Sequence, residues 1–124
     1  MKRLPRRLIF TRNIVLLLAV FFLLHPGTSI ATSPQDVKLD YDAATETLSV
    51  TITHPSSFPS FHYIKYVEIN NGSGAIRNTY DSQPDQDTFT YTYKVSAAPG
   101  AMIEVTATCS LYGYKTVYLT LGKK

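Results

Sequence analysis

Short runs in which apolar and polar residues alternate recur along most of this 124-residue chain. The pattern is clearest in Thr47–Thr53 (TLSVTIT) and in Met102–Cys109 (MIEVTATC). A two-residue period places alternate side chains on opposite faces of a β-strand, so that one face of each run can be buried. Because the 3.6-residue period of an amphipathic helix is absent from residues 32–124, the sequence predicts an all-β domain.

Seven such runs are expected to form strands. They are Val37–Tyr41, Thr47–Thr53, Tyr63–Asn70, Ala75–Tyr80, Thr88–Val95, Met102–Cys109 and Lys115–Leu121. Turn residues separate them, and the clearest turn signal is Asn70–Gly74 (NNGSG), which is typical of a hairpin. Seven short antiparallel strands in about 90 residues predict an immunoglobulin-like β-sandwich, in which two sheets pack face to face.

The first 31 residues differ in composition from the rest of the chain. Five of the 12 Lys and Arg residues lie within residues 1–12, and the chain has no acidic residue before Asp36. Residues 14–24 (IVLLLAVFFLL) form an apolar run of 11, which is followed by Pro26-Gly27 and then by small residues. A basic start, a short apolar segment and a small-residue cleavage site make up a secretory signal peptide. The sequence therefore predicts a signal peptide helix over residues 1–31 and an exported domain over residues 32–124, which would be periplasmic, extracellular or at the cell surface.

An uncleaved membrane anchor is the alternative interpretation of the same segment. Its apolar run is short, because a bilayer-spanning helix needs about 20 apolar residues. Without the five N-terminal cations the chain keeps seven Lys and Arg residues against nine Asp and Glu, a formal charge of −2. This balance argues against nucleic acid as a partner.

Cys109 is the only cysteine of the chain, so no disulfide within the chain is available to it. Exported small domains ordinarily use cysteines in pairs. A lone thiol in such a domain is a buried apolar side chain, half of an intermolecular disulfide, or a metal ligand. Composition alone leaves these three alternatives open.

Strand parity places His54 and Cys109 on the inward side of their strands, each at the C-terminal end. If successive strands alternate in direction, the second and sixth strands end at the same end of the sandwich. The connections that follow them also carry His62 and Tyr112. Imidazole and thiolate groups suit iron, zinc or copper, so the sequence predicts a metal site at this end. The alternative is that the two histidines are ordinary loop residues and that no metal binds.

These segments resemble the superoxide reductase family, the ferrous-iron domain of desulfoferrodoxin. That family carries a His-Pro pair and then a His-Tyr-Ile sequence followed by aromatic, apolar and Glu residues, as in His54-Pro55 and His62–Glu68 here. It also carries a Cys-x-x-His-Gly motif, to which Cys109–Gly113 (CSLYG) corresponds. The resemblance covers about residues 47–117 and implies the same immunoglobulin-like fold.

The resemblance implies a mononuclear iron held by four histidines and one axial cysteine thiolate, and reduction of superoxide to peroxide with electrons from an external donor. His54 and His62 correspond to two of the equatorial histidines, and Cys109 corresponds to the axial thiolate. Tyr112 stands at the position of the last histidine and is a further candidate ligand, whereas no histidine of residues 32–124 precedes His54. The implied ligand set is therefore incomplete.

Three functions remain open at this point. The first is a superoxide reductase-like oxidoreductase with a degenerate iron site, and the second is a His/His/Cys zinc or copper site with a metal-handling role. The third is an immunoglobulin-like binding module that has lost the metal and contacts a protein partner. A weaker resemblance links the His-Pro…His-aromatic-Ile segment to sulfur-oxidation carrier-complex proteins, which do not explain the turn Cys109–Gly113.

Overall fold

The computed structural model describes Ile14 and residues 33–123. Apart from Ile14, the predicted signal peptide and its cleavage site lie outside the described residues. The chain divides into two units, Met1–Ile30 and Ala31–Lys124, and the strands that the structure describes belong to the second. In the part of the chain that the structure describes, no helix has the length and apolar character needed to cross a membrane.

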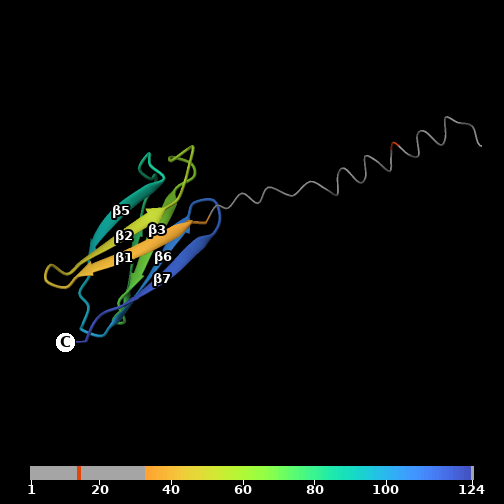
Figure 1. Ribbon diagram of the computed structural model, residues 1–124. Coiled ribbons are helices and arrows are strands. Elements are labelled where there is room, and N and C mark those ends of the chain that lie inside the picture. Colours follow the sequence, from red (N-terminus) through yellow and green to blue (C-terminus); the bar gives the residue numbers. More distant parts are fainter. Residues whose placement is uncertain (1–13, 15–32, 124) are drawn as a thin grey trace, which may run out of the picture. The chain divides into compact units, whose positions relative to one another are not determined.

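Seven strands follow one another along the second unit (Figure 1). They are β1 (Asp36–Asp42), β2 (Thr47–Thr53), β3 (Ile64–Asn70), β4 (Ala75–Thr79), β5 (Thr88–Lys94), β6 (Met102–Cys109) and β7 (Tyr114–Thr120). The predicted strands are confirmed, with every boundary within one residue of the expected position. Alternation predicted the boundaries well because most of the strands bury only one of their faces, whereas β4 has no buried residue.

The strands form two antiparallel sheets, with the orders β1-β2-β5 and β4-β3-β6-β7. The sheets pack as the two layers of a sandwich, and β1 contacts β7 along one side (Figure 1). This arrangement confirms the predicted immunoglobulin-like β-sandwich. The central strands β2 and β6 belong to opposite sheets, and their C-terminal ends lie at the same end of the molecule.

The core consists of the inward faces of both sheets. Its most completely buried side chains are Leu48, Val50, Ile52, Ile64, Val67, Ile103, Val105 and Ala107. Most of these residues are two apart within a strand, as the alternation predicts. The spacing from Ile64 to Val67 differs, because the register of β3 against β6 shifts between Ile64 and Tyr66. This β-bulge lets both side chains point inward, and it bends the start of β3 at the end of the sandwich where β2 and β6 finish.

Tyrosines close the other side of the sandwich, where β5 and β4 are the outer strands. Tyr80 follows β4, and its ring stacks on Tyr91 of β5 with centroids 4.3 Å apart. The hydroxyl groups of Tyr80 and Tyr93 lie 2.6 Å apart, at hydrogen-bond distance. Burial raises the pKa of Tyr91 to about 12, and burial together with the Tyr80 hydrogen bond also raises the pKa of Tyr93. The alternation of tyrosine with threonine in β5 therefore serves sheet packing.

This tyrosine cluster predicts a loss of stability in alkali. Tyrosines of the unfolded chain ionise near pH 10, whereas Tyr91 and Tyr93 hold their protons to higher pH in the folded protein. The contribution of their neutral forms is complete below about pH 10 and is lost as the pH rises through the folded pKa values. Urea unfolding near pH 8 and near pH 11 should show this loss, and the loss should be smaller in Tyr93→Phe. Equal pH dependence in both proteins would contradict the expectation.

Candidate metal centre

Three side chains with metal-binding groups meet at one end of the sandwich. His54 directly follows β2, His62 lies two residues before β3, and Cys109 ends β6. One ring nitrogen of each histidine and Cys109 Sγ all lie within 4.8 Å of one another. The structure therefore brings together the three residues that strand parity and direction had placed at this end.

The spacing of these three groups is compatible with a single ion. Protein nitrogens and sulfurs bind zinc at about 2.0–2.1 and 2.3 Å, so three ligands spread around one ion place a nitrogen and a sulfur about 3.6–3.8 Å apart. The three groups lie within 4.8 Å of one another, so side-chain movements of up to about 1 Å would bring all of them onto one ion. The rings of His54 and His62 are edge to face, with centroids 4.5 Å apart and planes at 71°.

Strand pairing and hydrogen bonds connect the bulged start of β3 to the end of β6. Ile64 pairs with Cys109 in the β3–β6 ladder, and the N–H of Ser110 donates to the carbonyl of Tyr63 at 2.8 Å. Ser110 Oγ accepts from the N–H of Tyr63 at 3.1 Å and donates to the carbonyl of Phe61 at 3.0 Å. These contacts span the position of the second histidine, so they hold its segment against the strand that carries the thiol.

Cys109 is buried, with 4% of its surface exposed, and its thiol lies at the start of a tight turn. The N–H of Leu111 approaches Sγ at 3.4 Å, and the N–H of Cys109 donates to the carbonyl of Gly113 at 2.9 Å. Gly113 has a φ of +91°, which residues with a Cβ rarely adopt. The N–H of Leu111 is thus a hydrogen-bond donor placed beside the candidate ligand atom of this residue.

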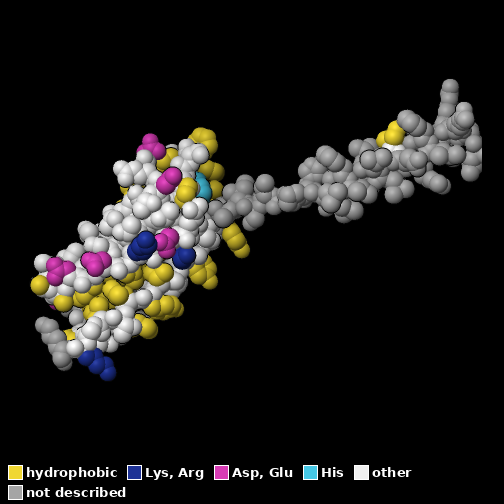
Figure 2. All heavy atoms as spheres, viewed as in Figure 1, with side chains coloured by type: hydrophobic (Ala, Val, Ile, Leu, Met, Phe, Trp, Pro, Cys, Tyr) yellow, Lys and Arg dark blue, Asp and Glu magenta, His cyan; other side chains and the backbone are white. Residues whose placement is uncertain are grey.

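The two histidines differ in exposure. His54 is 1% exposed, and its backbone N–H donates to the carbonyl of Asp87 at 2.8 Å. His62 is half-buried; its N–H donates to the carbonyl of Phe58 at 2.8 Å and its carbonyl accepts from Ser56 Oγ at 2.5 Å. Among the three site residues, His62 is therefore the one most exposed to solvent. Figure 2 shows histidine at the surface at this end, beside hydrophobic side chains.

Tyr112, the further candidate ligand, lies in the turn between β6 and β7 and is 81% exposed. Its role as a ligand stays a prediction. Sequence reasoning missed Gln83, which lies in the polar loop between β4 and β5 and is 7% exposed. Its side chain contacts the ring of His54, and a buried amide in a loop of exposed residues has no signal in the local sequence pattern.

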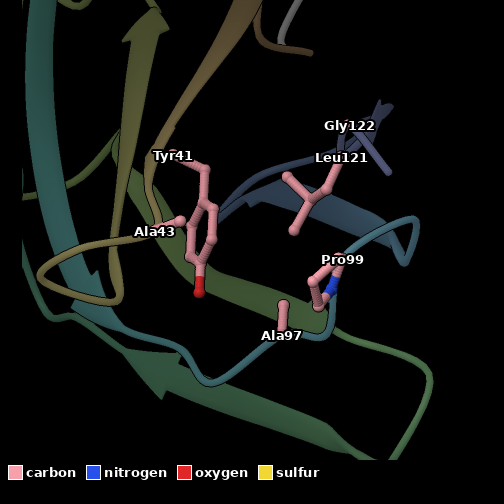
Figure 3. A pocket seen from close by; sticks show the side chains of 6 residues that line it. All are labelled: Tyr41, Ala43, Ala97, Pro99, Leu121 and Gly122. Atoms are coloured by element: carbon pink, nitrogen blue, oxygen red, sulfur yellow. The ribbon is translucent and has the colours of Figure 1, made fainter. Parts of the chain in front are cut away.

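A pocket of about 330 Å³ lies at the other end of the sandwich (Figure 3). It is lined by Tyr41, Ala43, Ala97, Pro99, Leu121 and Gly122. Its Tyr41 hydroxyl donates to the carbonyl of Val95 at 2.8 Å, so that this polar group of the lining supports the fold. The pocket lining combines apolar side chains with polar surface, whereas the His54, His62 and Cys109 side chains lie at the opposite end.

No protein-family model and no curated protein matches the chain. Similar solved structures include two of the superoxide reductase (neelaredoxin) from Ignicoccus hospitalis. Their TM-scores are 0.47 and 0.45 and their identities 14% and 13%; the matches cover 79% and 73% of this chain and 88% and 82% of those chains. The superoxide reductase from Nanoarchaeum equitans has a TM-score of 0.41 and 15% identity over 72% of this chain and 91% of that chain. These values are too low to assign a family or an activity to the protein.

Proposed function

We propose that the domain binds one transition-metal ion, iron in the first place, through His54, His62 and Cys109, and acts as a superoxide reductase-type oxidoreductase. The observation that carries the proposal is the convergence of the three ligand groups within 4.8 Å. Two imidazoles and a thiolate suit iron, zinc and copper, and the sequence resemblance favours iron among them. The predicted signal peptide makes the protein an exported one in this proposal.

Ferrous iron would supply the electron that reduces superoxide to peroxide. An external donor would then have to return the oxidised iron to the ferrous form. The residues of this chain have three tasks in that reaction. His54 and His62 hold the ion from the β2–β3 connection, and Cys109 holds it from the end of β6. The N–H of Leu111 stabilises the negative charge on the sulfur. His54 and Cys109 are buried and His62 is half-buried, so a small anion would have to approach the ion on the side of His62.

A second candidate function is a binding module that uses the same end of the sandwich without a metal. Large apolar side chains are exposed on the β2–β3 and β6–β7 connections, which border the three site residues, and at the start of β7. They are Phe58, Phe61, Leu111, Tyr112 and Tyr114, which we call the apolar rim. Contiguous exposed apolar patches on soluble domains often mark interaction sites. In this candidate a protein partner would cover the apolar rim.

Metal analysis of the purified protein separates the two candidates. The protein should be loaded without oxygen with ferrous iron, and in parallel with zinc or copper, and then freed of excess ion. We expect about one ion per chain in the wild type, with iron retained, and a loss of at least about tenfold in affinity in Cys109→Ser. The iron-loaded protein should consume superoxide without releasing oxygen.

Ala107→Ser is the matched control for Cys109→Ser. Ala107 is buried on the same face of β6, two residues before the cysteine, so the control also places a hydroxyl group in the core. It should keep the ion, because it removes no ligand. Equal metal content in the wild type and in Cys109→Ser would contradict the proposed ligand set. A wild-type protein that retains no ion would contradict metal binding, and the binding module would then be the remaining candidate function.

A further inference from the structure

Gln83 joins three parts of the candidate metal centre. It is buried, whereas the residues on either side of it in the loop between β4 and β5 are exposed. Its backbone N–H donates to the carbonyl of Pro59 at 3.1 Å, in the loop between the two histidines. Its side chain contacts both His54 and Ile64, the residue of β3 that pairs with Cys109. A single residue thus connects the end of β2, the start of β3 and the loop between them.

Two backbone contacts fix which way the amide of Gln83 points. Its Oε1 lies 3.1 Å from the backbone nitrogen of Ile64, and because a peptide N–H can only donate, the atom facing it must be the oxygen. Its Nε2 donates to the carbonyl of His54 at 2.8 Å, and a carbonyl can only accept. The orientation of the amide therefore follows from two independent partners, each with a single hydrogen-bonding role.

The same oxygen determines the protonation of the His54 ring. Nδ1 of His54 lies 2.7 Å from Gln83 Oε1, and an amide oxygen only accepts, so Nδ1 must carry the proton. A neutral imidazole carries one ring proton, which leaves the lone pair on Nε2. With Nδ1 directed at Gln83, Nε2 is the ring atom of His54 that can offer a lone pair to an ion.

We propose that Gln83 is a positioning residue, which holds His54 as the Nδ1–H tautomer and directs its Nε2 lone pair into the metal site. Hydrogen bonds of this kind from the second nitrogen fix the ring and raise its strength as a ligand, and their loss typically weakens metal binding by about 10–100-fold. The inference rests on the proposed function for the role of the ion. The tautomer itself is a property of the metal-free protein.

Nitrogen-15 NMR of the metal-free protein, at a pH where histidine is neutral, tests the tautomer directly. Long-range proton–nitrogen spectra distinguish the protonated from the unprotonated ring nitrogen of His54. We expect the Nδ1–H form in the wild type. In Gln83→Leu, which has no acceptor, the Nε2–H form should appear, and iron or zinc affinity should fall by about 10–100-fold.

Two further variants separate positioning from a merely structural role. Gln86→Leu makes the same replacement three residues later at an exposed position, and it should leave both the tautomer and the affinity unchanged. Gln83→Glu loses the donor to the His54 carbonyl but keeps an oxygen acceptor for Nδ1–H and for the Ile64 N–H, so the Nδ1–H form and a metal affinity above that of Gln83→Leu should return. This variant also serves as the comparison if Gln83→Leu does not fold.

The outcomes separate this inference from the proposed function. An Nε2–H ring in the wild type, or an unchanged tautomer in a folded Gln83→Leu protein, overturns the role of Gln83 even if the protein binds iron. If the wild-type protein has the Nδ1–H ring but binds no ion, the proposed function is overturned. The part of this inference that directs the Nε2 lone pair toward a metal is then overturned as well. A tautomer and an affinity that change together in Gln83→Leu, and recover in Gln83→Glu, support the proposal.

Discussion

Replacing Ile64 by alanine is expected to lower the free energy of unfolding by about 2–5 kcal/mol. The side chain is 0% exposed, so its removal loses the transfer free energy of the buried carbons and leaves a cavity. The surroundings of Ile64 resist collapse into that cavity, because its N–H is bonded to Gln83 and its strand is paired with Cys109. We therefore expect the loss in the free energy of unfolding to lie in the upper part of this range.

Ile76→Ala is the matched control for this experiment. Ile76 lies on β4 of the same sheet and is 53% exposed, so the same three carbons are removed from a position already in contact with water. Its effect should stay below about 1 kcal/mol. Urea unfolding followed by circular dichroism measures the free energy of unfolding of both variants. The slope of that free energy against urea concentration should be the same in the variants and in the wild type. Similar losses in the two variants would show that Ile64 is not the core position described above.

The second large effect is expected from Gly113→Ala, with a loss of about 2–4 kcal/mol. A left-handed backbone costs an alanine about 1–2 kcal/mol, and the φ of Gly113 is +91°. In addition, a Cβ at this position would lie 2.0 Å from Ser33 Oγ and 3.2 Å from Ser33 Cα. The hydroxyl group can rotate away, but the main chain of Ser33 must also shift at the entrance to β1.

Two other glycines separate the contributions of strain and close contact. Gly72 has a φ of +88°, and a Cβ added there would meet nothing within 4 Å, so Gly72→Ala should show the backbone strain alone. Gly74 has neither a positive φ nor a close neighbour, and Gly74→Ala should be nearly neutral. Unfolding of the three variants should give losses in the order Gly113, Gly72, Gly74. A Gly113→Ala protein as stable as Gly72→Ala would mean that Ser33 moves at no cost.

The strands and the convergence of the candidate ligands were predictable from sequence for the same reason. β2 and β6 each have one buried face, so parity shows which side of these strands His54 and Cys109 share with the core residues. Strand direction then shows at which end they lie. Neither inference needs a contact distance, and both held because the sandwich has a regular antiparallel topology.

The parts that sequence could not predict depend on contacts between distant segments. A regular strand cannot turn both Ile64 and Val67 inward, so the bulge at the start of β3 becomes visible only from the pairing with β6. Gln83 lies among exposed polar residues and is buried only because His54 and Ile64 surround its amide. The sequence pattern shows which face of a single strand is buried. The β-bulge and the burial of Gln83 depend instead on contacts between different strands and loops.

The order in which the sheets assemble has a consequence for when the candidate metal centre can exist. Three pairings, β1–β2, β3–β4 and β6–β7, join neighbours along the chain and can form as independent hairpins. His62 and Cys109 come together only through the pairing of β3 with β6, which closes a long loop. Such non-local pairings are the slow events in the folding of β-sandwiches. We therefore expect an ion to be captured late, by a chain whose two sheets have already joined.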